Sequence, residues 1–361
     1  MLKKSFFSIF FILTGVLFAS TSNNSDYKLL YREALHFFDN GDYGKAFSRA
    51  EDAITSKKQL CETQTKILSD AIAVRQVRKA GNKIDSVLKV LNERDEYDTA
   101  KIISSYVKIK GINFFENNIQ NLISYIKENS DYPEAQKLLG DIYKLEGEYD
   151  FAESFYKTAL ENANVLEIPD EKYEILYQLA DLSRLKDDFD SYELRLLNIL
   201  TEDKNFLNNT LITAMKNTIA QDTKDAVEKF FMLYRADSFY CLKAYNELTE
   251  YYFNQNQNEK ALNFACLSVI TGFTRLYNVI NDRDIDFEYS NLGDFFQEIV
   301  NFPDVNKWAS ENEVWKSFNK LSEVCIKLNY KNFAENLLKT IIQFSPDEYW
   351  QKNAVLQLSY L

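Results

Sequence analysis

The chain has 361 residues, with 42 basic and 54 acidic side chains, and a formal net charge of −12 at pH 7. A field of this sign repels nucleic acid and anionic lipid, so neither is an expected ligand. Only 9 glycines and 4 prolines accompany 27% charged and 15% aromatic residues, a composition that favours helix. The acidity either attracts a basic partner or simply keeps a long, exposed chain soluble.

The first twenty residues have the pattern of a secretory signal peptide. Lys3 and Lys4 precede an apolar run from Phe6 to Phe18, and small residues follow at Ala19 and Ser20. The run is short for a membrane span, which needs about 20 residues, so cleavage is expected and an uncleaved anchor is the alternative. No cysteine follows the run, so a lipid anchor is not expected. Export to a bacterial periplasm is predicted.

Residues 27–60 predict a helix hairpin. Asp39, Asn40 and Gly41 interrupt two helical segments, as turn residues do. Small and aromatic residues recur at defined places in both segments: Ala34, Phe37, Tyr43, Ala46 and Ala53. Apolar residues between 61 and 94 then predict one long helix, interrupted near Gly81. Residues 97–132 predict a further hairpin that turns at Lys110 and Gly111, with its second helix beginning at Phe114.

Residues 133–166 carry the same arrangement in its clearest form. Gly140 and Ala152 leave room for two helices to approach closely, Ala159 leaves room for the next helix, and Gly147 allows the turn. The stretch resembles the tetratricopeptide (TPR) family, whose repeats of about 34 residues stack into a superhelix. The resemblance implies an all-α, right-handed superhelical solenoid of stacked helix hairpins.

Weaker copies of the pattern follow at 173–206, 207–240, 242–275 and 315–348, and the three from 173 to 275 are predicted to stack without spacers. In 173–206, Tyr192 replaces a small contact residue, which predicts a splayed helix pair. Residues 276–314 break the register, and an aspartate-rich turn is expected there before a short helix. Residues 349–361 predict an amphipathic capping helix with four residues facing inward: Tyr349, Val355, Leu356 and Leu358.

The expected organisation therefore has six parts. They are a signal peptide at 1–20, a short linker at 21–26, a TPR unit with irregular hairpins at 27–132, a central TPR array at 133–275, an irregular helical insertion at 276–314, and a last TPR unit with its capping helix at 315–361.

TPR proteins usually bind partners on the concave face formed by the first helices of their pairs. The resemblance implies that this face carries Lys137, Asp141, Lys144, Tyr177, Asp181, Arg184, Asn246, Glu250 and Phe253, with Asn319 and Glu323 further along. Some members hold a carboxylate tail with an asparagine, but Asp141, Asp181 and Glu250 stand at its place here. A carboxylate there repels another carboxylate, which argues against capture of such a tail. For each residue the alternative is a merely solvated side chain.

Catalytic and metal-binding patterns are not evident. His36 is the only histidine, so neither a histidine metal site nor a His-based triad can be assembled. Phosphate-binding glycine motifs are absent. Asp282–Asp286 suggest a calcium loop, but the segment lacks the glycine and the terminal glutamate of an EF-hand, so a solvated turn is favoured. We expect no cofactor. The four cysteines are interpreted as buried free thiols, with a Cys241–Cys266 disulfide as the alternative.

The sequence thus predicts a non-enzymatic periplasmic scaffold or adaptor that binds proteins and assembles an envelope complex. An amino-acid composition rich in Lys, Asn, Ile and Phe indicates an AT-rich genome. An exported TPR protein from such a genome would suit a TPR collar around a spirochaete flagellar motor. Two alternatives belong to other classes: a small-ligand receptor that feeds a transporter through an aromatic-lined pocket, and a helical-repeat enzyme that acts on the cell wall.

Overall fold

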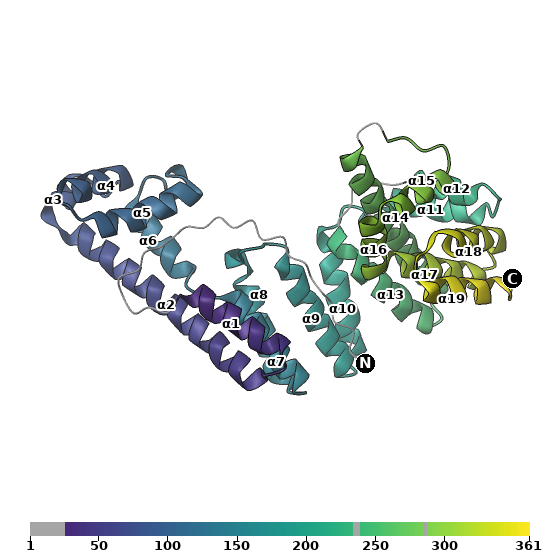
Figure 1. Cartoon of the computed structure of the whole chain (residues 1–361), viewed down its shortest axis with the longest axis horizontal. Helices are drawn as coiled ribbons and strands as arrows, with labels where there is room; N and C mark the ends of the chain where they lie inside the picture. Colours follow the sequence, from purple (N-terminus) through teal and green to yellow (C-terminus); the bar gives the residue numbers. More distant parts are fainter. Residues whose placement is uncertain (1–25, 234–238, 285–286) are drawn as a thin grey trace. The chain divides into compact units, whose positions relative to one another are not determined.

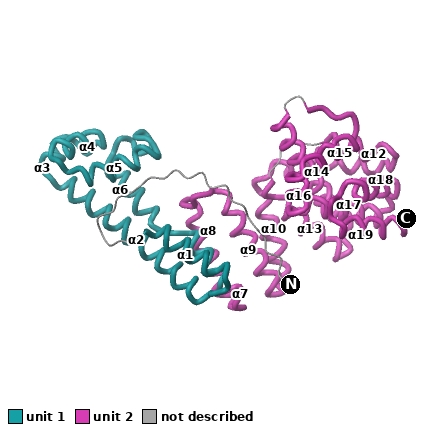
Figure 2. The backbone as a smooth tube through the Cα atoms, viewed as in Figure 1, with its two compact units in different colours: residues 1–142 teal, residues 143–361 magenta. Residues whose placement is uncertain are grey.

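The computed structural model describes residues 26–233, 239–284 and 287–361, and their regular structure is helical (Figure 1). The prediction of an all-α protein is confirmed. The predicted signal peptide lies outside the described residues. Among the residues described, no helix combines the length and the apolar character needed to cross a bilayer. The chain divides into two compact units, residues 1–142 and 143–361, and the boundary along the chain falls within helix α7 (Pro133–Leu145) (Figure 2). Each unit is described by itself.

The first unit begins with the predicted hairpin of α1 (Tyr27–Asp39) and α2 (Tyr43–Ala73). Gly41 takes the left-handed φ of +78° that its turn requires. Asp42 caps α2 by accepting a hydrogen bond from the Lys45 amide. Ala34 and Ala46 are completely buried, as expected for the small residues of a close helix pair.

Helix α2 is longer than predicted and runs for 31 residues to Ala73. The expected break near Gly81 is present, since Gly81 has φ +70°, but an earlier break occurs at Val74, which is extended. The helix expected over 61–94 is therefore wrong: its first part belongs to α2. The remainder forms α3 (Arg75–Lys79) and α4 (Ile84–Glu93).

Helices α5 (Tyr97–Lys110) and α6 (Ile119–Glu128) form the next predicted hairpin, with the turn at Gly111. The second helix begins five residues later than Phe114, because Glu116 and Asn117 adopt positive φ values that a helix cannot contain. Asn118 then caps α6. The distal part of α2 packs with these helices around one apolar core, whose most deeply buried members include Leu68, Val87, Leu91, Ile103 and Leu122.

In the second unit, helix pairs succeed one another along the chain. They are α8 (Tyr149–Glu161) with α9 (Glu171–Leu185) and α10 (Phe189–Ile199), α13 (Leu242–Asn254) with α14 (Asn258–Arg283), and α17 (Val314–Lys327) with α18 (Lys331–Phe344) and α19 (Glu348–Leu358). Helix α13 packs directly against α10, and α17 packs against both α13 and α14.

The pair α11 (Asn209–Ala220) and α12 (Ala226–Phe231) does not lie between α10 and α13, so the predicted unbroken stack from 173 to 275 is wrong. Instead, α11 packs on α14 and α12 packs on α18. The buried Tyr245 hydroxyl donates to the Asp203 carboxylate, which draws the segment after α10 onto α13. Asp222 accepts a hydrogen bond from the Phe333 amide at 2.9 Å, which ties the displaced pair to the start of α18.

Residues 276–314 are mostly helical. Helix α14 continues to Arg283, and the short helices α15 (Leu292–Asn301) and α16 (Pro303–Glu311) follow. The expected short helix after the turn is α15. Aromatic rings of this region pack with those of neighbouring helices into one core, which explains much of the aromatic content: Phe230, Phe231, Phe273, Phe295, Phe296, Trp315, Phe318 and Phe333 are all essentially buried.

Helix α19 is the predicted terminal helix, but it faces the protein with different residues. Tyr349, Val355 and Leu356 expose more than half of their surface, so their inward orientation was wrong. Ala354 and Gln357 are buried instead, and the Gln357 amide donates to the Asn319 side chain at 2.7 Å. Polar pairing with α17 therefore sets the rotation of this helix. The four cysteines are free and buried, as favoured over a Cys241–Cys266 disulfide.

Candidate functional site

The strongest candidate site is a small hollow of the second unit, which we call the α9–α13 hollow. Residues from three helices line it: Tyr177, Ala180, Asp181 and Arg184 of α9, Tyr192 and Leu196 of α10, and Lys243 and Glu247 of α13. Tyr177, Asp181 and Arg184 follow one another at spacings of four and three residues, so they share one face of α9. The structure thus brings together one of the predicted groups of site residues.

Asp181 is the centre of an ion-pair cluster beside the hollow. Its carboxylate accepts hydrogen bonds from Lys144, at the end of α7, and from Arg184, whose Nε lies 3.1 Å from Oδ1. Burial opposes ionisation of this carboxyl, but the hydrogen bonds from Lys144 and Arg184 outweigh it and lower the pKa of Asp181. The Lys144 ammonium also donates to Gln178 at 2.6 Å. The carboxylate is therefore held in place as an anion.

Arg184 is the more accessible cation of the cluster, because its side chain is 53% exposed whereas that of Lys144 is 20% exposed. On the opposite wall, the Tyr192 hydroxyl donates to the Glu247 carboxylate. Glu247 also favours the charged form of Arg184 and helps to raise its pKa, an effect in which the hydrogen bond to Asp181 is the largest. The hollow therefore offers both signs of charge within one small area.

Tyr177 is not the exposed groove residue that the sequence suggested. Its hydroxyl donates to the Tyr240 carbonyl at 2.5 Å and accepts from the Ala244 amide at 3.0 Å. Burial is the main reason that the pKa of Tyr177 is raised. This side chain therefore connects α9 to the beginning of α13.

Two further predicted groove residues are buried. Asn246 is 1% exposed, and its amide oxygen accepts from the Ser268 hydroxyl at 2.5 Å. Asn319 is completely buried and is bound by Gln357. The exposed face of α13 instead carries Lys243, Glu247 and Glu250. Helix α13 is therefore rotated about its axis relative to the orientation that the repeat template predicts.

The remaining predicted residues have different surroundings. Glu250 is partly exposed and lies 3.4 Å from Lys316 and 3.7 Å from Lys320, measured to each ammonium nitrogen. Phe253 is partly buried against the apolar core, and Glu323 pairs with Lys320 at 3.0 Å. Lys137 and Asp141 belong to the first unit, where they form an ion pair of 3.0 Å along α7.

Sequence reasoning missed Lys243, Glu247 and the role of Tyr192. The four-residue spacing of Lys243 and Glu247 was visible, but the repeat template gave these positions no role. The hydrogen bond from Tyr192 could not be predicted from the neighbouring sequence, since its partner Glu247 lies 55 residues away. Within the described ranges, no group of three or more histidine, cysteine, aspartate or glutamate side chains could hold a metal ion. What the hollow can do chemically is exchange ion pairs and hydrogen bonds with a bound molecule.

Comparison with known proteins gives two relatives and no family. The chain matches no protein-family model. It is 26% identical to an uncharacterised protein of Treponema pallidum (strain Nichols) over 326 residues, which cover 89% of this chain and 87% of that protein. It is 19% identical to an uncharacterised protein of Borreliella burgdorferi over 260 residues, which cover 64% of this chain and 80% of that protein. The chain is thus similar over most of its length to proteins of two spirochaetes.

Proposed function

We propose that the chain is a non-enzymatic scaffold of stacked, TPR-like helix pairs that binds a protein partner at the α9–α13 hollow. The observation that carries this proposal is the half-exposed Arg184 beside an anchored carboxylate, in a hollow built from three helices. An arginine that is already oriented by a carboxylate loses little side-chain freedom when it binds, and arginine is enriched among residues that dominate binding energy.

The proposal includes export and a place in the cell envelope. The basic and apolar start of the sequence supports export to the periplasm, with an uncleaved, membrane-anchored form as the alternative. The spirochaete origin of both relatives supports an envelope assembly such as a collar around the flagellar motor. A membrane would then be reached only through the complex.

The receptor alternative is less well supported by the contacts of the hollow. A receptor pocket needs polar groups that converge on an enclosed ligand. Here the hydroxyls of Tyr177 and Tyr192 are engaged with the Tyr240 carbonyl and the Glu247 carboxylate. Polar groups committed to neighbouring helices favour a surface for a partner over an enclosed ligand pocket.

Charge reversal at the hollow tests the scaffold proposal. We expect Arg184→Glu to weaken capture of crosslinked partners from the native host by about thirtyfold, on the order of 2 kcal/mol. Lys339→Glu is the matched control, because it changes the net charge equally at an exposed lysine of α18. Both variants should keep the helical circular-dichroism spectrum. Equal capture by wild type and Arg184→Glu would show that the hollow is not the binding surface.

A further inference from the structure

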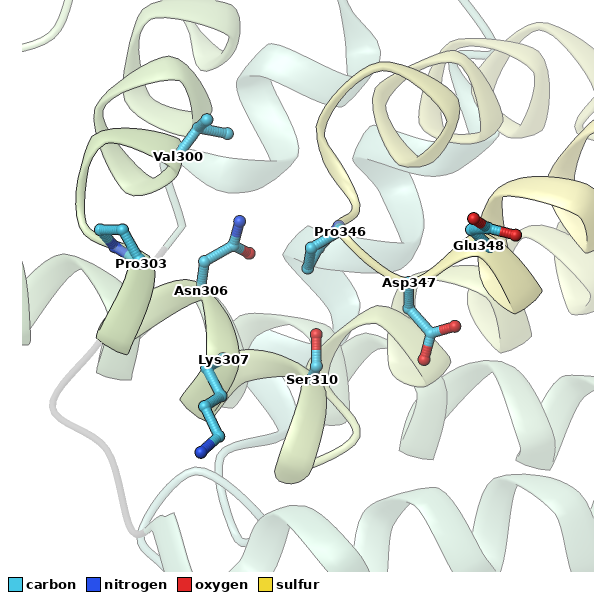
Figure 3. A pocket seen from close by; sticks show the side chains of 8 residues that line it. All are labelled: Val300, Pro303, Asn306, Lys307, Ser310, Pro346, Asp347 and Glu348. Carbon is cyan, nitrogen blue, oxygen red and sulfur yellow. The ribbon is translucent and has the colours of Figure 1, made fainter.

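A larger cavity lies elsewhere in the second unit, between α16 and the beginning of α19. Its volume is about 520 Å³. Eight residues line it: Val300, Pro303, Asn306, Lys307, Ser310, Pro346, Asp347 and Glu348. Four of them, Pro303, Asn306, Lys307 and Ser310, belong to α16. Figure 3 shows Pro346, Asp347 and Glu348 on the opposite wall. None of these residues belongs to the α9–α13 hollow.

The floor of the cavity contains two unsatisfied polar groups. Asn306 and Ser310 are four residues apart on α16, so they share one face of the helix. Asn306 is only 8% exposed. Its Oδ1 and the Ser310 Oγ are buried, and neither finds a hydrogen-bond partner in the described part of the chain. In Figure 3 both side chains extend toward the space bordered by Pro346. Buried polar atoms almost always have partners, so these two oxygens are available to accept hydrogen bonds from water or from a molecule bound in the cavity.

The charges around the cavity indicate which kind of group fits. Asp347 contributes one carboxylate, and Glu348 contributes a second that is paired with Lys352 at 2.9 Å. Lys307 contributes one ammonium. The Lys307 side chain is 75% exposed, lies 3.6 Å from Glu311 and points away from Asn306 (Figure 3). A ligand with several N–H donors and a positive charge can donate hydrogen bonds to the Asn306 carbonyl oxygen, the Ser310 hydroxyl oxygen and the Asp347 carboxylate at the same time.

We infer that this cavity binds an ammonium or guanidinium group, supplied either by a basic side chain of a protein partner or by a free organic cation. Val300, Pro303 and Pro346 provide apolar walls for the methylene groups that such a cation carries. The site goes beyond the proposed function and does not depend on it, since it uses other helices and other residues.

Matched pairs of cationic and neutral probes test the inference by isothermal titration calorimetry on the mature chain. The free-cation arm compares N-propylguanidinium with the neutral N-propylurea. The peptide arm compares acetyl-Gly-Arg-Gly-amide with the same peptide carrying neutral citrulline. Binding of both cations, with little binding of the neutral probes, is expected for a free organic cation. Binding of the arginine peptide alone indicates a protein side chain. Failure of both cationic probes to bind overturns the inference.

Two conservative variants locate the binding. Asp347 caps α19 by accepting from the Tyr349 amide at 2.9 Å, and asparagine caps equally well. Asp347→Asn should therefore keep the fold and weaken cation binding by about tenfold, since a charge-assisted hydrogen bond is lost. Asn306→Asp should tighten cation binding about threefold or more, because it places a charge at the buried acceptor.

Glu335→Gln is the control for net charge, because this exposed acid of α18 pairs with Lys339 and does not line the cavity. Circular dichroism and thermal melting establish that each variant is folded. Unchanged cation affinity in folded Asp347→Asn, or equal weakening in Glu335→Gln, contradicts the inference. Capture of partners through the α9–α13 hollow should be unaffected by Asp347→Asn, so the two proposals can fail separately.

Discussion

The Tyr177 hydroxyl serves both a carbonyl and an amide of the segment that leads into α13. Its ring also packs against the main apolar core of the second unit. Removing the hydroxyl would leave two backbone groups without their partner in a poorly hydrated place. The residue therefore contributes to the hollow through the position of α13.

We predict that Tyr177→Phe lowers the free energy of unfolding by about 1–2 kcal/mol, because the partners of a deleted hydroxyl remain buried. Urea denaturation followed by circular dichroism measures this change. Tyr360→Phe is the control, since Tyr360 is 75% exposed and should be nearly neutral. Equal stability of both variants would mean that the two hydrogen bonds of Tyr177 add nothing to the fold.

At the scale of elements, Glu153 joins three helical segments. This carboxylate of α8 pairs with Lys157 on its own helix, with Lys186 after α9 and with Arg195 of α10, at 2.6–2.9 Å. Burial opposes its ionisation, but the hydrogen bonds from Lys186, Lys157 and Arg195 outweigh burial and lower the pKa of Glu153 from 4.5 to about 2. A lowered pKa stabilises the fold above pH 4.5, and this contribution disappears as the pH falls toward 2.

We predict that Glu153→Gln destabilises the protein at pH 7 by about 1–2 kcal/mol, a value reduced by the solvent that screens part of the cluster. The difference from wild type should shrink as the pH is lowered below 4.5, which urea denaturation at several pH values can follow. Glu348→Gln, at the exposed pair with Lys352, should show little effect at any pH. A Glu153→Gln effect independent of pH would contradict the proposed ion-pair link.

Hairpins were predictable where turn chemistry is local. Gly41 and Gly147 both take positive φ at turns that their sequence context already marked. The displacement of α11 and α12 was not predictable in this way. It depends on Tyr245 with Asp203, 42 residues apart, and on Asp222 with Phe333, 111 residues apart. A repeat template assumes that neighbours in sequence stack in space, and these long-range hydrogen bonds override that assumption.

The candidate site was predictable where a single helix sets the positions of its residues, and not where packing between helices sets them. Asp181 and Arg184 lie where helical spacing places them, because only their own helix decides this. The prediction for Asn246 was wrong because packing against α14 sets the rotation of α13. This rotation places the Asn246 side chain where its oxygen accepts a hydrogen bond from Ser268. The cavity beside α16 gave no sequence signal, since it forms between segments about 40 residues apart.

At the scale of the whole molecule, the predicted export determines whether the functional protein retains its first twenty residues. Cleavage at the predicted site would remove Lys3 and Lys4 and leave 40 basic and 54 acidic residues, so the net charge would change from −12 to −14. We predict that N-terminal sequencing of the protein from its native host begins near Ser20 or Thr21. If the membrane-bound protein retains Met1, the segment is an uncleaved membrane anchor and the protein is not released into the periplasm.

Helix α2 has a mechanical consequence for the first unit. At 1.5 Å per residue, its 31 residues form a rod of about 46 Å. One end packs against α1, and the other end packs against α3, α5 and α6. An unbroken α-helix resists twisting, so the rod fixes the phase between its two ends. Each residue inserted or removed along its middle would turn one end relative to the other by about 100°. The number of residues in α2 therefore sets the rotation between the groups of helices packed at its two ends.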